Sequence, residues 1–371
     1  MLIRLPIALL ALLLQFSVGS AVAPACQPFA SDGTPSTVVA SLKKGFNLPG
    51  WLDQSRPRRP DPALLAELAQ RGFTHVRLPF EPQLLFSPFA EQFQAEMDRA
   101  LDQLIGLGFT VSLDNHPGAT FIGDYAQRPD EGYARLSKAW ATITQRMAGR
   151  GREKVFFELW NEPPIGQALW RAHAERLIVE IRKTDPDRTI LFGDAPFERF
   201  EPLISQAPLP FSNVVYVVHF YDPMVFTHQG ADWMPGTTYA QVKGVPFPAG
   251  PDDPRLLELK KELTAAGHAQ AVADLDEAYA EAWTPDRINE AFTFMRTWAQ
   301  RHGVHVIVNE FGVLEGAAEP GSRAAWLKSV RQAAERNCIG WAHWELLDGF
   351  GFVGRDGRTI DESVADALLD D

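Results

Sequence analysis

The stretch Val155-Phe-Phe-Glu-Leu-Trp-Asn-Glu-Pro163 gives the clearest indication of how this chain folds. Its apolar part, 155–160, predicts a short buried strand. Two polar residues, Asn161 and Glu162, come directly after that strand, and a segment of helical period follows near 166–183. The stretch therefore begins a unit in which a strand, a polar end and a helix follow one another.

The same unit recurs on both sides of this stretch. The expected strands lie at 46–48, 75–78, 109–113, 155–160, 189–192, 214–219, 304–309 and 339–344, each before a segment of helical period. Eight such units are the number that closes a (β/α)8 barrel, so we predict a single-domain TIM barrel of the α/β class. An open, doubly wound sheet is the alternative, but no G-x-G-x-x-G turn follows the first expected strand.

The connection after the sixth expected strand is long. Residues 234–283 contain two further expected helices, at about 254–266 and 268–281. Loops that follow the strands of a TIM barrel lie on its active-site face. We therefore expect a helical insertion that narrows or caps the site.

The composition is that of an ordinary globular protein, with 46% hydrophobic and 22% charged residues in a chain of 371. Asp and Glu outnumber Lys and Arg by 47 to 35, which gives a net charge of -12. Because no basic cluster could follow a phosphate backbone, we expect no nucleic-acid partner. We expect a monomer.

Residues 1–23 have the parts of a secretory signal peptide: the basic Arg4, an apolar run from Leu5 to Phe16, and small residues that end at Ala23. A membrane anchor is the alternative, but it needs roughly 20 apolar residues. We expect cleavage after Ala23, a mature domain at 24–371, a secreted or periplasmic location, and no membrane attachment after cleavage.

The chain has two cysteines, Cys26 and Cys338. Both remain after the expected cleavage, in a compartment that permits disulfides. Cys338 precedes the eighth expected strand and Cys26 precedes the first, and these strands are neighbours in a closed barrel. A Cys26–Cys338 disulfide is therefore our hypothesis.

The residues that end the expected strands are candidates for an active site, because TIM barrels place their chemistry at the carboxyl ends of the strands. Glu162 and Glu310 each end a strongly apolar strand, where an unpaired charge would be costly. Two glutamates that face one cleft suit glycoside hydrolysis; the alternative is two buried glutamates that each pair with a cation. The strand ends are Asn47, Arg77, Asp114 with His116, Asn161 with Glu162, Asp194, His219 with Tyr221, Glu310, and Trp344.

Several of these strand ends resemble the motifs of glycoside hydrolase family 5, a family of retaining cellulases and mannanases with a (β/α)8 barrel. The resemblance runs from about Lys43 to Leu369. The matching motifs are Gly45–Leu48, Val76–Pro79, Asp114–His116, Asn161–Pro163, His219–Tyr221, Glu310–Gly312 and Trp341–Glu345.

The resemblance implies that Glu310 is the nucleophile and Glu162 the acid/base. Arg77 would then hold Glu310 ionised through a charge-assisted hydrogen bond, and Tyr221 would donate to the same carboxylate. We expect the charge of Glu310 to raise the pKa of Glu162 and His219 to tune its protonation.

The resemblance also implies a set of sugar contacts. Asn161 would donate to the sugar 2-hydroxyl and His116 would bind a neighbouring hydroxyl, although Asn115 stands where many relatives have a second histidine. The expected substrate-binding residues are Asn47, Arg77, His116, Asn161, His219, Tyr221, Trp233 and Trp344, with the two tryptophans as stacking platforms. No metal or other cofactor is implied, because the remaining histidines lack ligand spacing.

The segment Val218–Trp233 resembles the corresponding loop of bacterial endo-β-1,4-glucanases in this family, so the predicted substrate is a β-1,4-glucan polysaccharide or oligosaccharide. β-Mannanase or glucomannanase activity and exo-acting β-glucanase activity are alternatives. A carbohydrate-binding barrel without catalysis is the alternative from a different class of protein.

Overall fold

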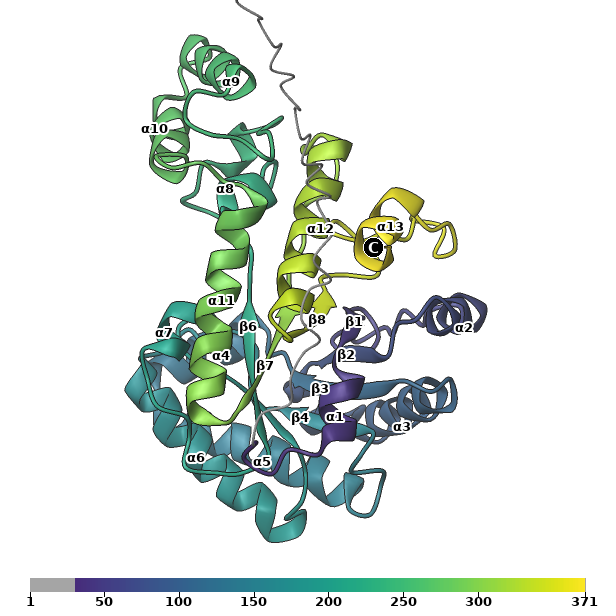
Figure 1. The fold of residues 1–371 in the computed structure, drawn as a ribbon. Coiled ribbons are helices and arrows are strands. Elements are labelled where there is room, and N and C mark those ends of the chain that lie inside the picture. Colours follow the sequence, from purple (N-terminus) through teal and green to yellow (C-terminus); the bar gives the residue numbers. More distant parts are fainter. Residues whose placement is uncertain (1–30, 371) are drawn as a thin grey trace, which may run out of the picture.

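The computed structural model describes residues 31–370 and shows a closed barrel of eight parallel strands in the order β1 to β8 (Figure 1). Closure comes from the pairing of β1 with β8, in which Gly45 lies opposite Ala342. The predicted TIM barrel is therefore confirmed. The strands are β1 Lys44–Asn47, β2 His75–Phe80, β3 Thr110–Asn115, β4 Val155–Glu158, β5 Ile190–Gly193, β6 Val214–His219, β7 His305–Glu310 and β8 Gly340–His343.

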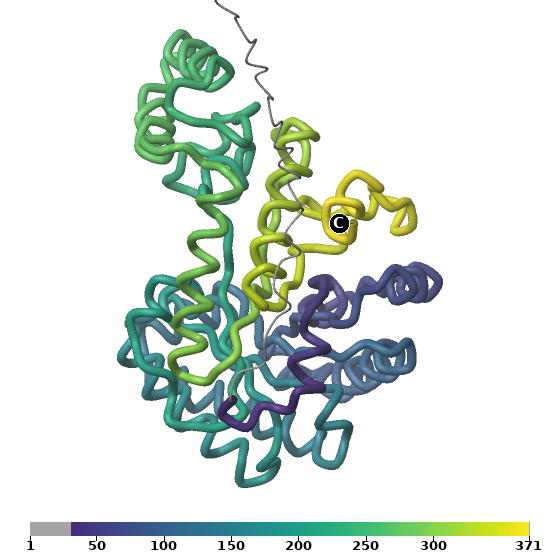
Figure 2. The backbone as a smooth tube through the Cα atoms, in the orientation of Figure 1, coloured from purple at the N-terminus to yellow at the C-terminus, as the bar shows by residue number. Residues whose placement is uncertain are grey.

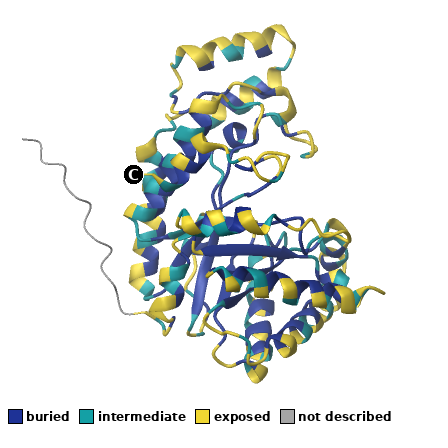
Figure 3. Ribbon diagram, turned by 90° about the vertical axis from the view of Figure 1, so that its right-hand side faces the viewer, coloured by how far each residue is buried: buried dark blue, intermediate teal, exposed yellow. Residues whose placement is uncertain are grey.

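Helices cover the outside of the barrel, and their outward faces are exposed while the strands are buried (Figure 3). Between β3 and β4 the structure has two helices, α4 and α5, where one segment of helical period was expected. The helices are α1 Ser36–Ser41, α2 Pro62–Gln70, α3 Ala90–Gly106, α4 Ala119–Gln127, α5 Pro129–Met147, α6 Gln167–Thr184, α7 Phe200–Ile204, α8 Met224–Thr227, α9 Pro254–Ala265, α10 Ala269–Ala278, α11 Pro285–His302, α12 Pro320–Arg336 and α13 Glu362–Leu369, with 3-10 turns η1 Pro82–Phe86 and η2 Tyr239–Gln241.

Local sequence explains where α11 begins and ends. Thr284 accepts a hydrogen bond from the backbone N–H of Arg287, and Pro285 occupies the first helical position. Gly303 ends the helix with a φ of 65°, a left-handed conformation that glycine adopts without strain. Between these caps, Ile288, Phe292, Met295 and Ala299 recur at helical spacing and are buried.

The interior of the barrel is apolar at one end and polar at the other. At the amino ends of the strands, Val38 and Leu42 pack with Phe156, Val215 and Ile307, so α1 closes the bottom of the barrel. At the carboxyl ends the inward side chains are polar and buried; among them are Asn47, Arg77, Asp114, Glu158, Asn309 and His219. This polar layer forms the floor of the candidate site.

The predicted insertion is present as a lobe of residues 234–283 that contains α9 and α10. The chain leaves the barrel after β6, forms the lobe and returns through α11 (Figure 2). The lobe packs on the connection between β7 and α12, where the N–H of Gly244 donates to the carbonyl of Ala317 at 3.0 Å. It does not cap the site, because the Glu162 side chain remains 38% exposed.

Two sequence predictions fall at the amino end of the chain. The predicted signal peptide at 1–23 and Cys26 lie outside the described residues, so the cleavage site and the Cys26–Cys338 disulfide stay predictions. Cys338 itself precedes β8 at the bottom of the barrel, as expected. Within residues 31–370, none of the helices has the length and apolar character that a membrane span requires.

Candidate active site

Arg77 organises the floor of the site from β2. Its side chain is fully buried, and its Nη2 lies 2.7 Å from Oε1 of Glu158 and 3.0 Å from Oδ2 of Asp114. Its Nε also donates to both Glu158 oxygens at 3.0 Å. One guanidinium thus compensates several buried carboxylates, which a buried charge requires.

Asn47 and Asn309 complete this floor from β1 and β7. Asn47 accepts from Nη1 of Arg77 at 2.9 Å and donates to the carbonyl of Asn309 at 2.8 Å. Asn309 donates to Glu158 at 2.9 Å. Asn47 and Arg77 are both 0% exposed, so they lie beneath the site and position other groups. Direct substrate binding by either residue stays a prediction.

Glu310 ends β7 and receives three polar partners. Arg77 donates to its Oε1, Tyr221 donates to its Oε2 at 3.0 Å, and Nδ1 of His219 lies 3.3 Å from the same oxygen. The residue is 5% exposed. The predicted placement of Arg77 and Tyr221 on this carboxylate is confirmed, and the two contacts fix its orientation.

Glu162 lies just beyond β4, across from Glu310. Its backbone φ is 45°, in the left-handed region that residues other than glycine rarely adopt. Its Oε1 lies 2.8 Å from Nδ1 of His219. One oxygen of Glu162 and one of Glu310 lie within 4.8 Å of each other.

The protonation of Glu162 differs from the sequence expectation. Burial raises the pKa of Glu162, but the hydrogen bond and positive charge of His219 outweigh burial, and the net shift is downward. The expected rise caused by Glu310 is therefore wrong for the free protein. The predicted role of His219 in tuning Glu162 is supported by their contact.

Asn161 and His116 lie beside the glutamates. Asn161 accepts from Nη2 of Arg77 at 2.7 Å, and its Nδ2 lies 3.3 Å from Nε2 of His116. His116 is held by Asp114, 2.8 Å from its Nδ1. These contacts fix the orientation of both side chains while each keeps partial exposure to the cleft.

Aromatic side chains form one wall of the site. The ring of Trp344 stacks against His116 with 5.9 Å between ring centroids. Further out, Trp233 is 54% exposed and meets Phe350 edge to face at 6.4 Å. We call Trp344, Phe350 and Trp233 the aromatic rim; Trp51, by contrast, is fully buried and donates to Glu96.

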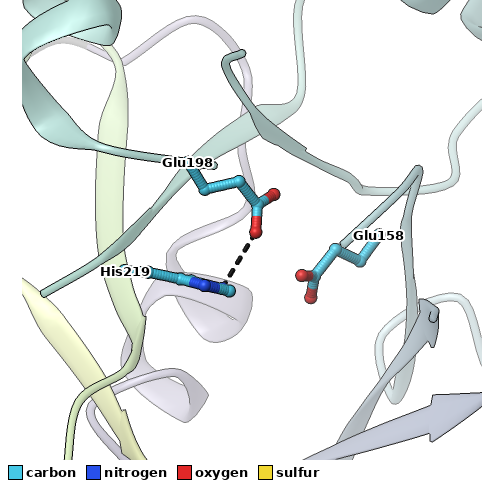
Figure 4. A group of neighbouring side chains, drawn as sticks. All are labelled: Glu158, Glu198 and His219. Carbon is cyan, nitrogen blue, oxygen red and sulfur yellow. Dashed lines mark ion pairs between the residues drawn. The ribbon is translucent and has the colours of Figure 1, made fainter. Parts of the chain in front are cut away.

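Sequence reasoning did not identify all of the residues that matter here. Glu198, in the connection between β5 and α7, lies 2.9 Å from Nε2 of His219 (Figure 4). Glu158, Asn309 and Phe350 also contribute. Glu158 lies within a predicted strand, and Asn309 is the last residue of another. An alternation of inward positions along β4 and β7 was the signal that could have found Glu158 and Asn309.

Two groups of side chains have a spacing that could hold a cation. The ligand atoms of Glu158, Glu198 and His219 lie within 4.8 Å of one another, as do those of Glu162, His219 and Glu310. In the first group both Glu158 oxygens already accept from Arg77. The second group contains the two carboxylates suited to glycoside hydrolysis, so we assign neither group to a metal.

Comparisons with known proteins agree with this geometry. The family described as Cellulase (glycosyl hydrolase family 5) matches residues 30–347. Endoglucanase 3 of Fibrobacter succinogenes is 28% identical over 86% of this chain and 51% of its own length, so this chain spans about half of that relative. Endoglucanase C of Acetivibrio thermocellus is 28% identical over 89% of this chain and 98% of its own length.

Solved structures share the fold. The cellulose synthase subunit Z of Clostridioides difficile superimposes with a TM-score of 0.72 and 25% identity, over 88% of this chain and 99% of that chain. Thermotoga maritima Cel5A, solved with a mannotriose substrate, gives a TM-score of 0.73 at 23% identity, over 90% of this chain and 100% of that chain. At that identity the second likeness shows the fold alone.

Proposed function

Because this chain belongs to glycoside hydrolase family 5, we propose that it is a retaining endo-β-1,4-glucanase. The observation that carries the proposal is the spacing of Glu162 and Glu310, whose nearest described oxygens lie within 4.8 Å. Retaining glycosidases hold their two carboxyl groups about 5–5.5 Å apart, whereas inverting enzymes need about 6.5–9.5 Å for an intervening water.

In the first step Glu310 attacks the anomeric carbon, and the glycosidic bond breaks as Glu162 gives its proton to the departing oxygen. Arg77 and Tyr221 hold Glu310 as an oriented anion through the contacts described above. Asn161, fixed by Arg77 and His116, is placed to donate to the 2-hydroxyl of the sugar, a contact that strengthens in the transition state.

In the second step Glu162 acts as a base. It removes a proton from water, the water oxygen attacks the anomeric carbon, and the bond to Glu310 breaks. His219, 2.8 Å from Glu162, supports both roles because its Nδ1 can share a proton with that carboxylate. The two displacements together retain the configuration of the anomeric carbon.

The choice of β-1,4-glucan is supported by the relatives named as endoglucanases and by the form of the site. The aromatic rim offers flat apolar surfaces on which the faces of pyranose rings can stack. The insertion lobe leaves Glu162 accessible, which suits binding within a long chain. Mannan and glucomannan are the nearest competing substrates, because a mannotriose complex of Cel5A has been solved.

The location of the protein is a separate part of the proposal. The composition of residues 1–23 supports secretion or export to the periplasm, and the mature protein would then begin at Pro24. Amino-terminal sequencing of protein recovered from culture medium or periplasm tests this. An intact Met1 in the purified protein would contradict it.

The experiment that tests the activity is reducing-sugar release from carboxymethyl cellulose, mixed-linkage β-glucan, glucomannan, mannan and laminarin. We expect the highest rates on the β-1,4-glucans, with loss of viscosity early in the reaction as internal bonds break. Proton NMR of the first products would show the β-anomer if configuration is retained. Early release of the α-anomer would contradict the assigned mechanism.

Glu310→Ala provides the control for each polymer. Activity that disappears in this variant assigns hydrolysis to the site. If wild type and variant are equally inert on every polymer but both bind glucan in an affinity gel, the protein is a carbohydrate-binding barrel and the catalytic proposal fails.

A further inference from the structure

Glu198 is buried beneath the active site, and no step of the reaction described above uses it. It belongs to the connection between β5 and α7, where Phe197 and Glu198 have φ values of 59° and 53°. This turn leaves Phe197 50% exposed and Glu198 0% exposed. Left-handed conformations in consecutive residues are costly, and they occur most often where the surroundings require them.

The barrel makes room for this carboxylate. A Cβ atom on Gly193 would lie 1.8 Å from Oε1 of Glu198, so only glycine at that inward position of β5 allows the side chain to enter. The backbone N–H of His219 donates to the carbonyl of Glu198 at 2.9 Å, which ties the turn to β6. The position of Glu198 is therefore built into the fold.

Glu198 has one close polar partner among residues 31–370. Its Oε2 lies 2.9 Å from Nε2 of His219, which makes an ion pair. Neither Glu198 oxygen accepts a hydrogen bond within this part of the chain. Glu198 and His219 point toward each other in Figure 4. A buried carboxylate without hydrogen bonds keeps its charge only beside a cation, so the two groups ionise together.

His219 faces carboxylates on its other side as well. Its Nδ1 lies 2.8 Å from Glu162 and 3.3 Å from Glu310. The remaining charged groups around it come from other strands. They are Arg77 on β2, Asp114 on β3 and Glu158 on β4, with the hydroxyl of Tyr221 after β6.

We propose that Glu198 is a positioning residue whose negative charge keeps a proton on the His219–Glu162 pair and thereby sets the alkaline limit of acid catalysis. The inference rests on the proposed role of Glu162 as the acid/base. His219 Nδ1 and Glu162 Oε1 share one hydrogen-bonded proton, which must be on Glu162 when the glycosidic oxygen departs. The pair can supply that proton for as long as either member holds it.

The direction of the effect follows from charge. Burial lowers the pKa of His219, but Glu310 and Glu198 raise it, and the net shift is well above the ordinary value. Burial also raises the pKa of Glu198. Because Glu198 lies 2.9 Å from Nε2 of His219, protonation of one group changes the affinity of the other for its proton. Removing the negative charge of Glu198 must therefore lower the affinity of the His219–Glu162 pair for the proton that it shares.

Glu198→Gln keeps the shape of the side chain and removes its charge. For an unactivated cello-oligosaccharide, we expect the alkaline limb of kcat/KM to move to lower pH by about one unit or more. For 2,4-dinitrophenyl β-cellobioside, whose leaving group needs no proton, we expect the same alkaline limb in variant and wild type. Glu201→Gln is the matched control, because Glu201 is exposed in the adjacent α7 and pairs with Arg199.

Nitrogen NMR of the histidine rings gives a readout that does not depend on activity. The His219 signal, assigned by its absence in His219→Asn, should stay protonated in the wild type well above pH 7 and titrate at lower pH in Glu198→Gln. A wild-type His219 that titrates near the ordinary value of about 6.5 would overturn the proposal, and this measurement needs no variant of Glu198.

The kinetic outcomes also decide the question. A uniform fall in kcat/KM at every pH, on both substrates, would mean a structural role and would contradict the proposal. If the wild type hydrolyses no glucan, the proposed function fails, whereas the NMR titration still tests the coupling of Glu198 to His219.

Discussion

The floor of the site and the aromatic rim differ in burial. On the floor, polar side chains from β1, β2, β4 and β7 are buried and joined by hydrogen bonds around Arg77. On the aromatic rim, Trp233 is 54% exposed and contacts Phe350. The floor residues stand on strands whose register fixes their neighbours. The rim residues stand on loops after β6 and β8. The proposed catalytic groups are therefore held by rigid strands, whereas the proposed polymer contacts lie on loops, which vary more readily.

Loss of Glu310, the proposed nucleophile, should have the largest effect of any change at the floor. We expect Glu310→Gln to lower kcat/KM on β-1,4-glucan by roughly 10⁴-fold or more, because the variant removes the carboxylate that lies within 4.8 Å of Glu162. Initial rates of the two proteins on the same polymer measure this. Glu315→Gln, an exposed position in the following loop, is the control; a Glu310→Gln variant with a tenth of wild-type activity would refute the role of Glu310.

Arg77→Met tests whether the floor depends on one cation. The variant leaves Glu158 buried without its ion-pair partner and leaves Asp114 with His116 alone, so we expect a loss of about 3–5 kcal/mol in the free energy of unfolding. Urea denaturation followed by tryptophan fluorescence measures it. The control is Arg71→Met, because the carboxylate partners of Arg71 are exposed; it should cost at most about 1 kcal/mol. Equal losses in the two variants would show that the floor does not depend on Arg77.

Trp344→Ala tests the part of the rim that lies against the catalytic groups. Trp344 stacks on His116, so its loss would remove the predicted sugar platform and loosen His116, which is predicted to bind a sugar hydroxyl. We expect kcat/KM to fall by about 10- to 100-fold, equivalent to about 1.4–2.8 kcal/mol. The measurement uses cello-oligosaccharides of increasing length; an unchanged kcat/KM on every length would place the sugar elsewhere.

Trp233→Ala should have the smallest effect. Because this ring is half-exposed and meets only the edge of the site, we expect KM for polymeric glucan to rise about three- to ten-fold, which is roughly 0.7–1.4 kcal/mol. We expect kcat/KM for a short aryl cellobioside to stay within about two-fold, a range of roughly 0.4 kcal/mol. A comparable loss on both substrates would show that Trp233 supports the catalytic groups rather than a distant sugar.

The strand ends were predictable because of a property of all parallel barrels. Every strand ends at the same face, so residues such as Asn161, Glu162, His219 and Glu310 could be assigned to one site without knowledge of their distances. The helices of the insertion could also be placed, since α9 and α10 fall within the residues predicted. Local pattern and chain direction were sufficient for both.

The roles of some of the same residues could not be predicted. Asn47 ends β1, yet its amide is occupied by Arg77 and Asn309 and does not reach the cleft. The pKa of Glu162 is lowered by the approach of His219 from another strand. Each result depends on which side chains meet across the barrel, and strand pairing brings together residues far apart in the sequence.

Periodicity and the cost of burying charge were enough to predict the eight strand-and-helix units, the face with the polar strand ends, and the two glutamates. Which side chain pairs with which became known from the folded chain. Glu198 reaches His219 because a left-handed turn and the empty space over Gly193 direct it inward. Burial and electrostatics depend on distances across the closed barrel, and those distances exist only once the chain has folded.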